Sequence, residues 1–80
     1  MAAREITFDI VKNIGVLTEN KTGWRREINI VSWNGAKPKL DIRDWGPEHQ
    51  KVGRGLSLNA EEVAILKELI ADYDPYEIEE

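Results

Sequence analysis

Hydrophobic and polar residues alternate along the first part of the chain. Over residues 6–18, apolar residues stand at the even-numbered positions 6, 8, 10, 14 and 16, and Lys12 is the one break in this series. A period of two is typical of a β-strand with one buried face. Glycine weakens a strand unless a bulge or bend requires it, so we expect one long strand that bends near Gly15.

The next two strands are predicted on either side of a turn. Residues 24–33 form the second, and it ends at Asn34-Gly35. Both turn residues tolerate the positive φ that a tight hairpin needs. The third strand covers residues 37–45, with a proline near its start.

The remainder of the chain is predicted to be a loop, a short strand and a helix. Residues 46–53 show no periodicity, and residues 54–58 alternate again. Asn59, followed three residues later by Glu62, predicts a helix N-cap with a reciprocal bond. The helix is expected from Ala60 to about Tyr73, where Asp74-Pro75 stops it. Residues 1–75 then form a single domain, followed by an acidic tail over residues 76–80.

One helix cannot cover both faces of a sheet. The sequence therefore predicts an α+β fold, with four antiparallel strands followed by one C-terminal helix, and leaves apolar surface uncovered. We expect a homodimer to bury it through the helices. The helix residues assigned to that interface are Ile65, Leu66, Leu69 and Tyr73.

Charge is divided unevenly along the 80 residues, whose formal net charge is -4. Residues 1–56 hold ten basic and seven acidic side chains, whereas from Ser57 onward there are one basic and eight acidic ones. All three tryptophans lie within residues 21–54, among eight basic and four acidic side chains. Aromatic residues interleaved with basic ones are typical of a platform that stacks nucleic-acid bases.

An enzyme is not indicated. The chain has no cysteine, and its single histidine, His49, lies in a polar loop where solvent exposure is expected. Asp41 and Asp44 stand three apart on a strand, which places them on opposite faces. The acidic C-terminal residues lack calcium-loop spacing. We expect no catalytic residue, no metal and no cofactor.

Alternation divides the second and third strands into two faces. Four apolar residues share the expected core face: Ile28, Ile30, Leu40 and Ile42. A polar, cationic and aromatic set shares the other: Arg25, Asn29, Trp33, Lys37, Lys39, Asp41, Arg43 and Trp45. Regular alternation would point Trp24 and Arg26 inward, which is unfavourable for Arg26 unless a bulge changes the register. The choice between Arg25 and Arg26 on the polar face therefore stays open.

Three segments resemble the positive-cofactor-four-like transcriptional coactivators: Leu40-Asp41-Ile42-Arg43-Asp44-Trp45, Lys51-Val52-Gly53-Arg54-Gly55 and Leu56-Ser57-Leu58-Asn59. The spacing of Gly23-Trp24-Arg25-Arg26-Glu27 and Val31-Ser32-Trp33-Asn34 is most similar to a compact bacterial branch of that family. The resemblance covers about residues 8–73. It implies a curved four-stranded sheet with one helix, dimerisation through the helices, and single-stranded DNA binding on the sheet.

The resemblance also assigns individual positions. Trp33 stands where the family has a base-stacking aromatic residue, and Arg43 matches the arginine of its Asp-Ile-Arg segment. Lys37 or Lys39 matches a lysine at the start of the family's third strand. Lys51 and Arg54 match basic residues of its glycine-containing loop. Trp45 stands one position before the family's tryptophan, where this chain has Gly46.

We therefore expect a homodimeric, sequence-tolerant single-stranded DNA-binding protein with a role in transcription or DNA repair. Bases would stack on Trp33 and Trp45, with Trp24 as a third candidate. The phosphate contacts would come from Arg25 or Arg26, Lys37, Lys39, Arg43, Lys51 and Arg54. Single-stranded RNA binding, and a protein-interaction module of the transcription machinery, are the alternatives.

The sequence also bears on location. No apolar run reaches the roughly 20 residues that a membrane-spanning helix needs, and the N-terminus lacks a signal-peptide core. We expect a cytoplasmic, nucleoid-associated protein in a bacterium, or a nuclear one in a eukaryote, with no membrane partner.

Overall fold

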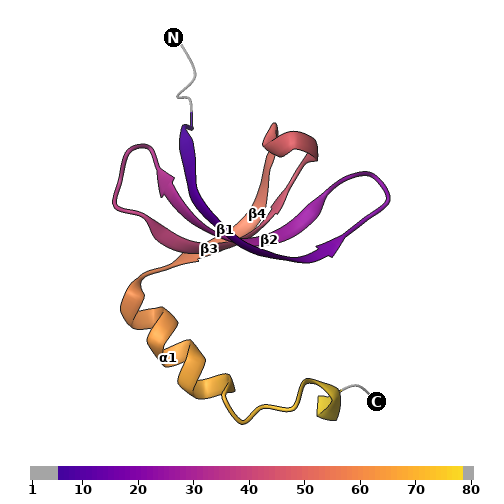
Figure 1. Cartoon of the computed structure of the whole chain (residues 1–80), viewed down its shortest axis with the longest axis vertical. Helices are drawn as coiled ribbons and strands as arrows, with labels where there is room; N and C mark the ends of the chain where they lie inside the picture. The colour runs from indigo at the N-terminus through magenta and orange to yellow at the C-terminus, as the bar shows by residue number, and fades with distance from the viewer. Residues whose placement is uncertain (1–5, 79–80) are drawn as a thin grey trace.

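The computed structural model describes residues 6–78 of the chain. Four antiparallel strands form one sheet in the order β1-β2-β3-β4, and a single helix follows them (Figure 1). The elements are β1 Phe8–Glu19, β2 Arg25–Trp33, β3 Lys39–Trp45, β4 Val52–Leu58 and α1 Ala60–Ile70, with short 3₁₀ helices η1 Pro47–His49 and η2 Pro75–Ile78. The predicted fold class is confirmed.

The helix begins where the sequence predicts. The Asn59 side chain accepts a hydrogen bond from the Glu62 backbone N–H at 2.8 Å, and the Glu62 carboxylate accepts from the Asn59 N–H at 2.9 Å. These reciprocal bonds satisfy two of the donors that every helix start leaves unpaired. The helix ends at Ile70, earlier than predicted, because the Ala71 N–H bonds to Glu68 and tightens the last turn.

β1 bends at three places rather than one. Its pairing with β2 shifts register between Ile10 and Lys12, between Asn13 and Gly15, and between Val16 and Thr18. Each shift inserts one extra residue and increases the local twist. The extra residues are Val11, Ile14 and Leu17, all apolar and exposed. The predicted bend near Gly15 is the middle one of the three.

The sheet curls strongly towards one face. Trp33 ends β2, and Trp45 pairs with Arg25 at the opposite end of that strand. A flat strand rises about 3.3 Å per residue, which would separate these positions by about 26 Å. Their rings nevertheless lie 6.0 Å apart and almost parallel, at 3°. We call the face that carries these rings the inner face. It holds the odd-numbered residues of β2 and β3, and the even-numbered ones form the outer face.

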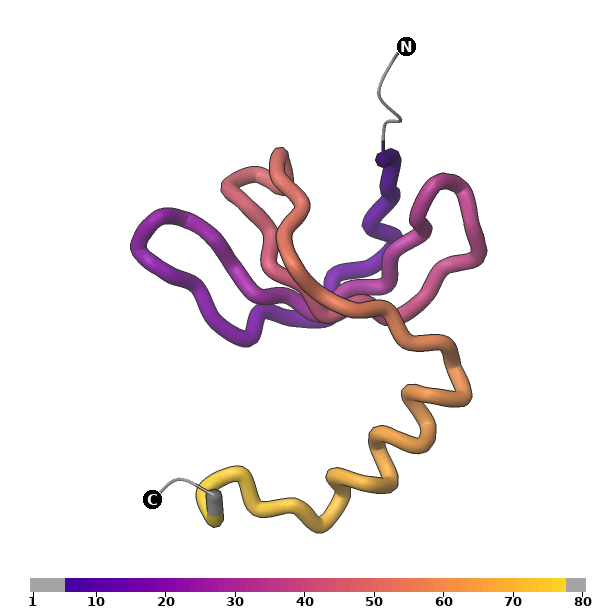
Figure 2. The backbone as a smooth tube through the Cα atoms, turned by 180° about the vertical axis from the view of Figure 1, so that it is seen from behind, coloured from indigo at the N-terminus to yellow at the C-terminus, as the bar shows by residue number. Residues whose placement is uncertain are grey.

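The helix lies on the outer side of this curled sheet. Figures 1 and 2 show the sheet curving away from α1 in both views. The start of the helix approaches the outer face at a shallow apolar groove. This groove is lined by Ile30, Pro38, Lys39, Leu40, Leu58, Ala60 and Val63. The rest of the helix extends beyond the sheet, so most of the outer face stays uncovered. No helix within residues 6–78 is long and apolar enough to cross a membrane.

The predicted core is wrong for the single chain. The outer-face residues Ile28, Ile30, Leu40 and Ile42 are only partly buried. The fully buried residues lie on the inner face instead: Val31, Trp45, Glu27, Asn29 and Asp41. The reason is the curl, which draws inner side chains together while one helix covers a single end of the outer face.

Candidate nucleic-acid interface

An aromatic cluster fills the curl of the sheet. Phe8 lies 4.9 Å from Trp45 and 5.9 Å from Trp33, measured between ring centroids. The His49 ring meets Trp45 edge-on at 5.1 Å. We call these four residues the aromatic wall. Trp45 is completely buried within it, whereas Trp33 keeps part of its ring exposed.

Burial changes the role of Trp45. A ring with no exposed surface cannot stack on a base, so the expectation that bases stack on Trp45 does not fit this structure. The Trp45 ring instead lies parallel to the Trp33 ring and packs against it. Alternation placed both tryptophans on one face correctly, but it could not show that the curl stacks one on the other.

Arg43 is held over the ring of Trp33. Its guanidinium carbon lies 4.7 Å from the Trp33 ring centroid. The Arg43 Nε donates to the Asp41 carboxylate at 3.0 Å, Nη2 donates to it at 2.8 Å, and Nη1 donates to the Gly53 carbonyl at 3.1 Å. The Ser57 hydroxyl donates to the same carboxylate at 2.8 Å. Two-point pairing of this kind fixes the plane of the guanidinium as well as its position.

Trp33 and Arg43 open onto a cleft of 320 Å³. Its lining consists of Ile6, Trp33, Asn34, Arg43, Val52 and Ser57. We call it the stacking cleft. Its walls combine an aromatic face, a cationic plane and apolar side chains, which is a suitable environment for a planar, partly polar ring.

A chain of hydrogen-bonded polar side chains crosses the inner face beside the aromatic wall. The Asn13 side-chain amide donates to Asn29 at 2.6 Å, and Asn29 donates to Glu27 at 3.0 Å. His49 Nε2 lies 3.0 and 3.1 Å from the two Glu27 oxygens. His49 was expected to be solvent-exposed, but this contact leaves it half-buried. No local pattern in the sequence could predict this contact, because His49 and Glu27 lie 22 residues apart.

The pKa of Glu27 reflects this environment. Burial disfavours the carboxylate and raises its pKa. Hydrogen bonds from Asn29 and His49, with the charges of His49 and Arg25, outweigh that effect and bring the pKa below its ordinary 4.5. Glu27 is therefore a buried carboxylate at neutral pH, and Arg25 Nε lies 3.6 Å from it.

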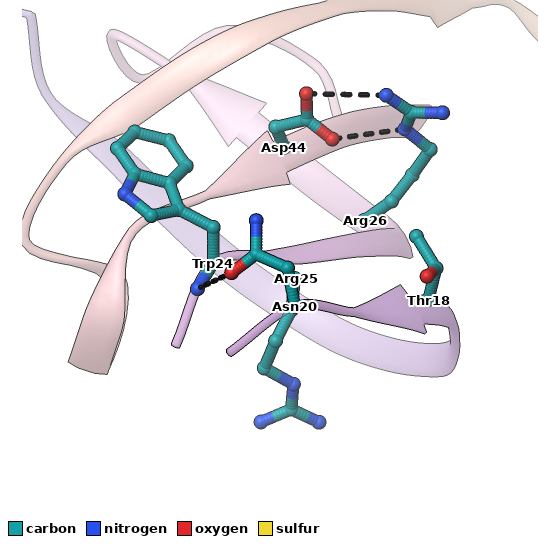
Figure 3. A pocket seen from close by; sticks show the side chains of 6 residues that line it. All are labelled: Thr18, Asn20, Trp24, Arg25, Arg26 and Asp44. Atoms are coloured by element: carbon teal, nitrogen blue, oxygen red, sulfur yellow. Dashed lines mark hydrogen bonds and ion pairs between the residues drawn. The ribbon is translucent and has the colours of Figure 1, made fainter. Parts of the chain in front are cut away.

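The structure decides between Arg25 and Arg26. Pairing between β2 and β3 runs in continuous register from Arg25–Trp45 to Val31–Lys39, so the bulge considered above does not occur there. Arg25 lies on the inner face. Arg26 lies on the outer face, where it stays exposed and forms a two-point pair with Asp44, at 2.9 and 3.3 Å. That pairing raises the pKa of Arg26 and lowers the pKa of Asp44. Figure 3 shows the two arginine side chains leaving β2 in different directions.

Trp24 belongs to a different recess from Trp33. With Arg26, Asp44, Asn20, Thr18 and Arg25 it lines a recess of 220 Å³ near the β1–β2 turn (Figure 3). Its ring lies so close to Gly46 and Gly53 that a Cβ at Gly53 would approach it to 2.9 Å. Trp24 and Arg26 therefore line this recess and are not part of the stacking cleft.

The remaining basic residues expected to contact phosphate are on the surface. Lys37 lies in the β2–β3 turn, Lys39 begins β3, Lys51 precedes β4 and Arg54 lies within it. All four are exposed, and the ion pairs found within residues 6–78 involve none of them. The same part of the chain contains no group of three or more His, Asp or Glu side chains placed to hold a metal ion.

The expected dimer residues are partly uncovered in the single chain. Leu69 is 75% exposed, and Ile65 and Tyr73 are also exposed, whereas Leu66 is partly buried. They leave an apolar helix surface without a partner in the single chain.

A curled four-stranded sheet with a cationic and aromatic inner face is the kind of surface on which single-stranded nucleic acid can stack. Sequence comparison identifies the family. The sequence model of the family Transcriptional Coactivator p15 (PC4) matches residues 20–69. A protein of Treponema pallidum (strain Nichols), named only as an uncharacterized protein, is 37% identical over 71 residues, which cover 86% of this chain and 84% of that protein. The chain belongs to the PC4 family of single-stranded DNA-binding transcriptional coactivators.

Proposed function

We propose that this protein is a homodimeric, largely sequence-independent single-stranded DNA-binding protein that regulates transcription. Membership of the coactivator family supports this role. The observation that carries it is the pairing of Trp33 and Arg43 at the stacking cleft. An unpaired base can lie against this pair, whereas the bases of a duplex are already stacked on one another.

Phosphate contacts come from the exposed basic residues around the inner face. Lys37, Lys39, Lys51 and Arg54 are the members of this group, with the exposed part of Arg25 beside them. Such contacts release counterions, so the affinity falls as salt rises. Trp24 and Arg26 line a different recess and are not among these contacts.

The apolar helix surface supports the dimer. Exposed Leu69, Ile65 and Tyr73 form a patch that a second copy of the chain would bury. A two-fold dimer formed through these residues leaves both inner faces accessible to DNA, because α1 lies on the outer side of each sheet.

Replacing Trp33 tests the function directly. Trp33→Ala should weaken binding to a pyrimidine single strand by about tenfold or more, since one base stacked on an aromatic ring contributes about 1–3 kcal/mol. Fluorescence anisotropy measures the affinity, and circular dichroism checks the fold. Trp24→Ala removes the same ring from the other recess and should leave the affinity close to that of the wild type. Equal losses in both variants would contradict the assignment of the site.

Competition with RNA tests the alternative ligand. Aromatic platforms stack unpaired RNA bases by the same physics, and only contacts to the 2′-hydroxyl separate the two polymers. We expect the DNA strand to displace the RNA strand of the same sequence more readily than the reverse. Tighter binding of the RNA would show that RNA is the preferred ligand of the same site.

A further inference from the structure

The chain of hydrogen-bonded polar side chains on the inner face borders a second recess, of 140 Å³. Its lining consists of Ile10, Asn13, Arg25, Glu27, Asn29 and His49. We call it the polar recess. Its lining comes from β1, β2 and η1, whereas β3 and β4 contribute half of the lining of the stacking cleft. The proposed stacking does not use these residues.

The polar groups of this recess are held in fixed positions. Asn13, Asn29 and Glu27 are linked in series by hydrogen bonds, and His49 closes the series from the opposite side. Glu27 is 1% exposed and Asn29 is completely buried. A buried polar network whose members are paired with one another is held rigidly in one arrangement.

The Glu27 carboxylate and the Arg25 Nε each have unused hydrogen-bonding capacity. Because Glu27 is a carboxylate, His49 Nε2 must carry the hydrogen, and this single N–H is shared between both Glu27 oxygens. Arg25 Nε is a buried donor with no hydrogen-bond partner among residues 6–78, and it stops 3.6 Å from Glu27 Oε2. A donor and an acceptor therefore lie side by side at the recess, and each can take one more bond.

A nucleobase edge has the complementary arrangement. Thymine presents its N3–H beside a carbonyl oxygen, and cytosine presents its amino group beside N3. Glu27 Oε2 and Arg25 Nε are both buried, so admission of a base requires the partly exposed Arg25 side chain to move. The base N–H can then donate to Glu27 Oε2 while the neighbouring acceptor receives the Arg25 Nε hydrogen. The recess has less than half the volume of the stacking cleft, which favours the single ring of a pyrimidine.

We propose that the polar recess is a second subsite, which holds one pyrimidine of the bound strand by its Watson–Crick edge. This inference rests on the proposed single-stranded DNA binding. It adds a base preference at one position to a surface that otherwise tolerates any sequence. Arg25 and Glu27 make the contacts, and Asn13, Asn29 and His49 hold them in place.

A thymine whose edge is blocked tests the subsite. N3-methylthymidine keeps the ring, the stacking face and the phosphate charge but loses the N3–H. The wild-type protein should bind a short oligothymidine roughly tenfold more tightly than the same strand made of N3-methylthymidine, which is the size of one good two-point base contact. Anisotropy titrations at one pH and one salt concentration give this ratio.

Two matched variants show whether the ratio comes from the recess. Arg25→Lys keeps the positive charge but removes the Nε donor, so the ratio should fall towards one. Arg26→Lys makes the same change on the outer face and should leave the ratio unchanged. Asn13→Ala is a second, independent test, which applies even where Arg25→Lys disturbs the fold. It lies on the exposed edge strand, removes the hydrogen bond to Asn29 and should also reduce the ratio.

Each outcome separates this inference from the proposed function. A large ratio in the wild type that falls in Arg25→Lys supports the subsite. Tight but equal binding of both strands overturns the subsite and leaves the stacking function intact. An affinity ratio that is the same in the wild type, Arg25→Lys and Asn13→Ala has the same meaning. No binding of either strand refutes both.

Discussion

Arg43 is the residue whose role differs most from the phosphate contact expected from sequence. Its Nε, Nη1 and Nη2 atoms all donate to protein acceptors, and its side chain is 16% exposed. The Asp41 carboxylate, fully buried beneath it, balances its charge. We therefore expect Arg43 to extend the stacking surface of Trp33 and to contribute little to the attraction of phosphate.

The salt dependence of binding distinguishes these roles. In the double variant Asp41→Asn, Arg43→Gln, a neutral pair replaces a charge-balanced one. We expect weaker single-strand binding with an unchanged slope of log affinity against log salt. Lys37→Gln should instead reduce that slope by about 0.7, as the loss of one single-strand phosphate contact does. A similar reduction in the double variant would show that Arg43 contacts phosphate.

Glu27 links stability to pH. Its pKa is lower in the folded protein than in the unfolded chain, so the unfolded chain binds more protons as the solution is acidified. The stabilisation is complete above the ordinary pKa of 4.5 and is lost as the pH falls through the lower folded value. Urea unfolding between about pH 3 and pH 7 should show a smaller acid-dependent loss in Glu27→Gln than in the wild type. Equal losses would contradict this role.

Sequence alternation predicts which residues share a face but not how far they are buried. It placed Trp33, Arg43 and Trp45 together, and the register confirms that placement. It could not predict that Trp45 is buried, because that depends on the three-dimensional curl. Nor could it predict the contact of His49 with Glu27, since a turn residue has no periodicity that would reveal its partner.

At the scale of elements, local signals were reliable where the interactions are local. The N-cap at Asn59 joins residues three positions apart and was predicted correctly. The bulges of β1 depend on pairing with β2, so the sequence showed only the one marked by Gly15. The fourth strand begins at Val52, two residues before the predicted start, because pairing with Trp45 extends it into the expected loop.

The helix cap gives a prediction at this scale. Most of α1 lies away from the sheet, so its stability depends strongly on its own ends. Asn59→Ala should lower the free energy of unfolding by about 1 kcal/mol, as loss of an N-cap side chain does. Asn59→Asp keeps an acceptor at the same place and should remain close to the wild type. Urea denaturation measures both, and an unchanged Asn59→Ala variant would show that the cap contributes nothing.

At the scale of the whole molecule, the single chain leaves its apolar surface incompletely covered. The outer sheet face is only partly buried, and exposed apolar residues continue along α1 and β1. The sequence predicted this uncovered apolar surface, because one helix cannot cover two faces of a sheet. It could not locate the buried core, because the curl that creates it arises from the pairing of all four strands.

A charged side chain within the apolar helix surface tests the proposed dimer. Leu69→Asp should weaken self-association by at least about tenfold, because burying a leucine contributes about 1.5–3 kcal/mol and a buried carboxylate opposes association. Ala64→Asp introduces the same charge about 140° away around the helix and should leave the dimer intact. Sedimentation velocity gives the oligomeric state, and a dimer that survives Leu69→Asp would place the interface elsewhere.

The central claim is that an unpaired base lies against Trp33, and tryptophan fluorescence tests it most directly. Trp45 is buried and Trp24 lies in another recess, so quenching by a bound base should come from Trp33. We expect a single-stranded pyrimidine oligonucleotide to quench the wild type and Trp24→Phe more than the matching duplex does. Trp33→Phe, which keeps a stacking ring, should still bind but lose the quenching. Quenching that persists in Trp33→Phe, or is absent from the wild type, would contradict the account.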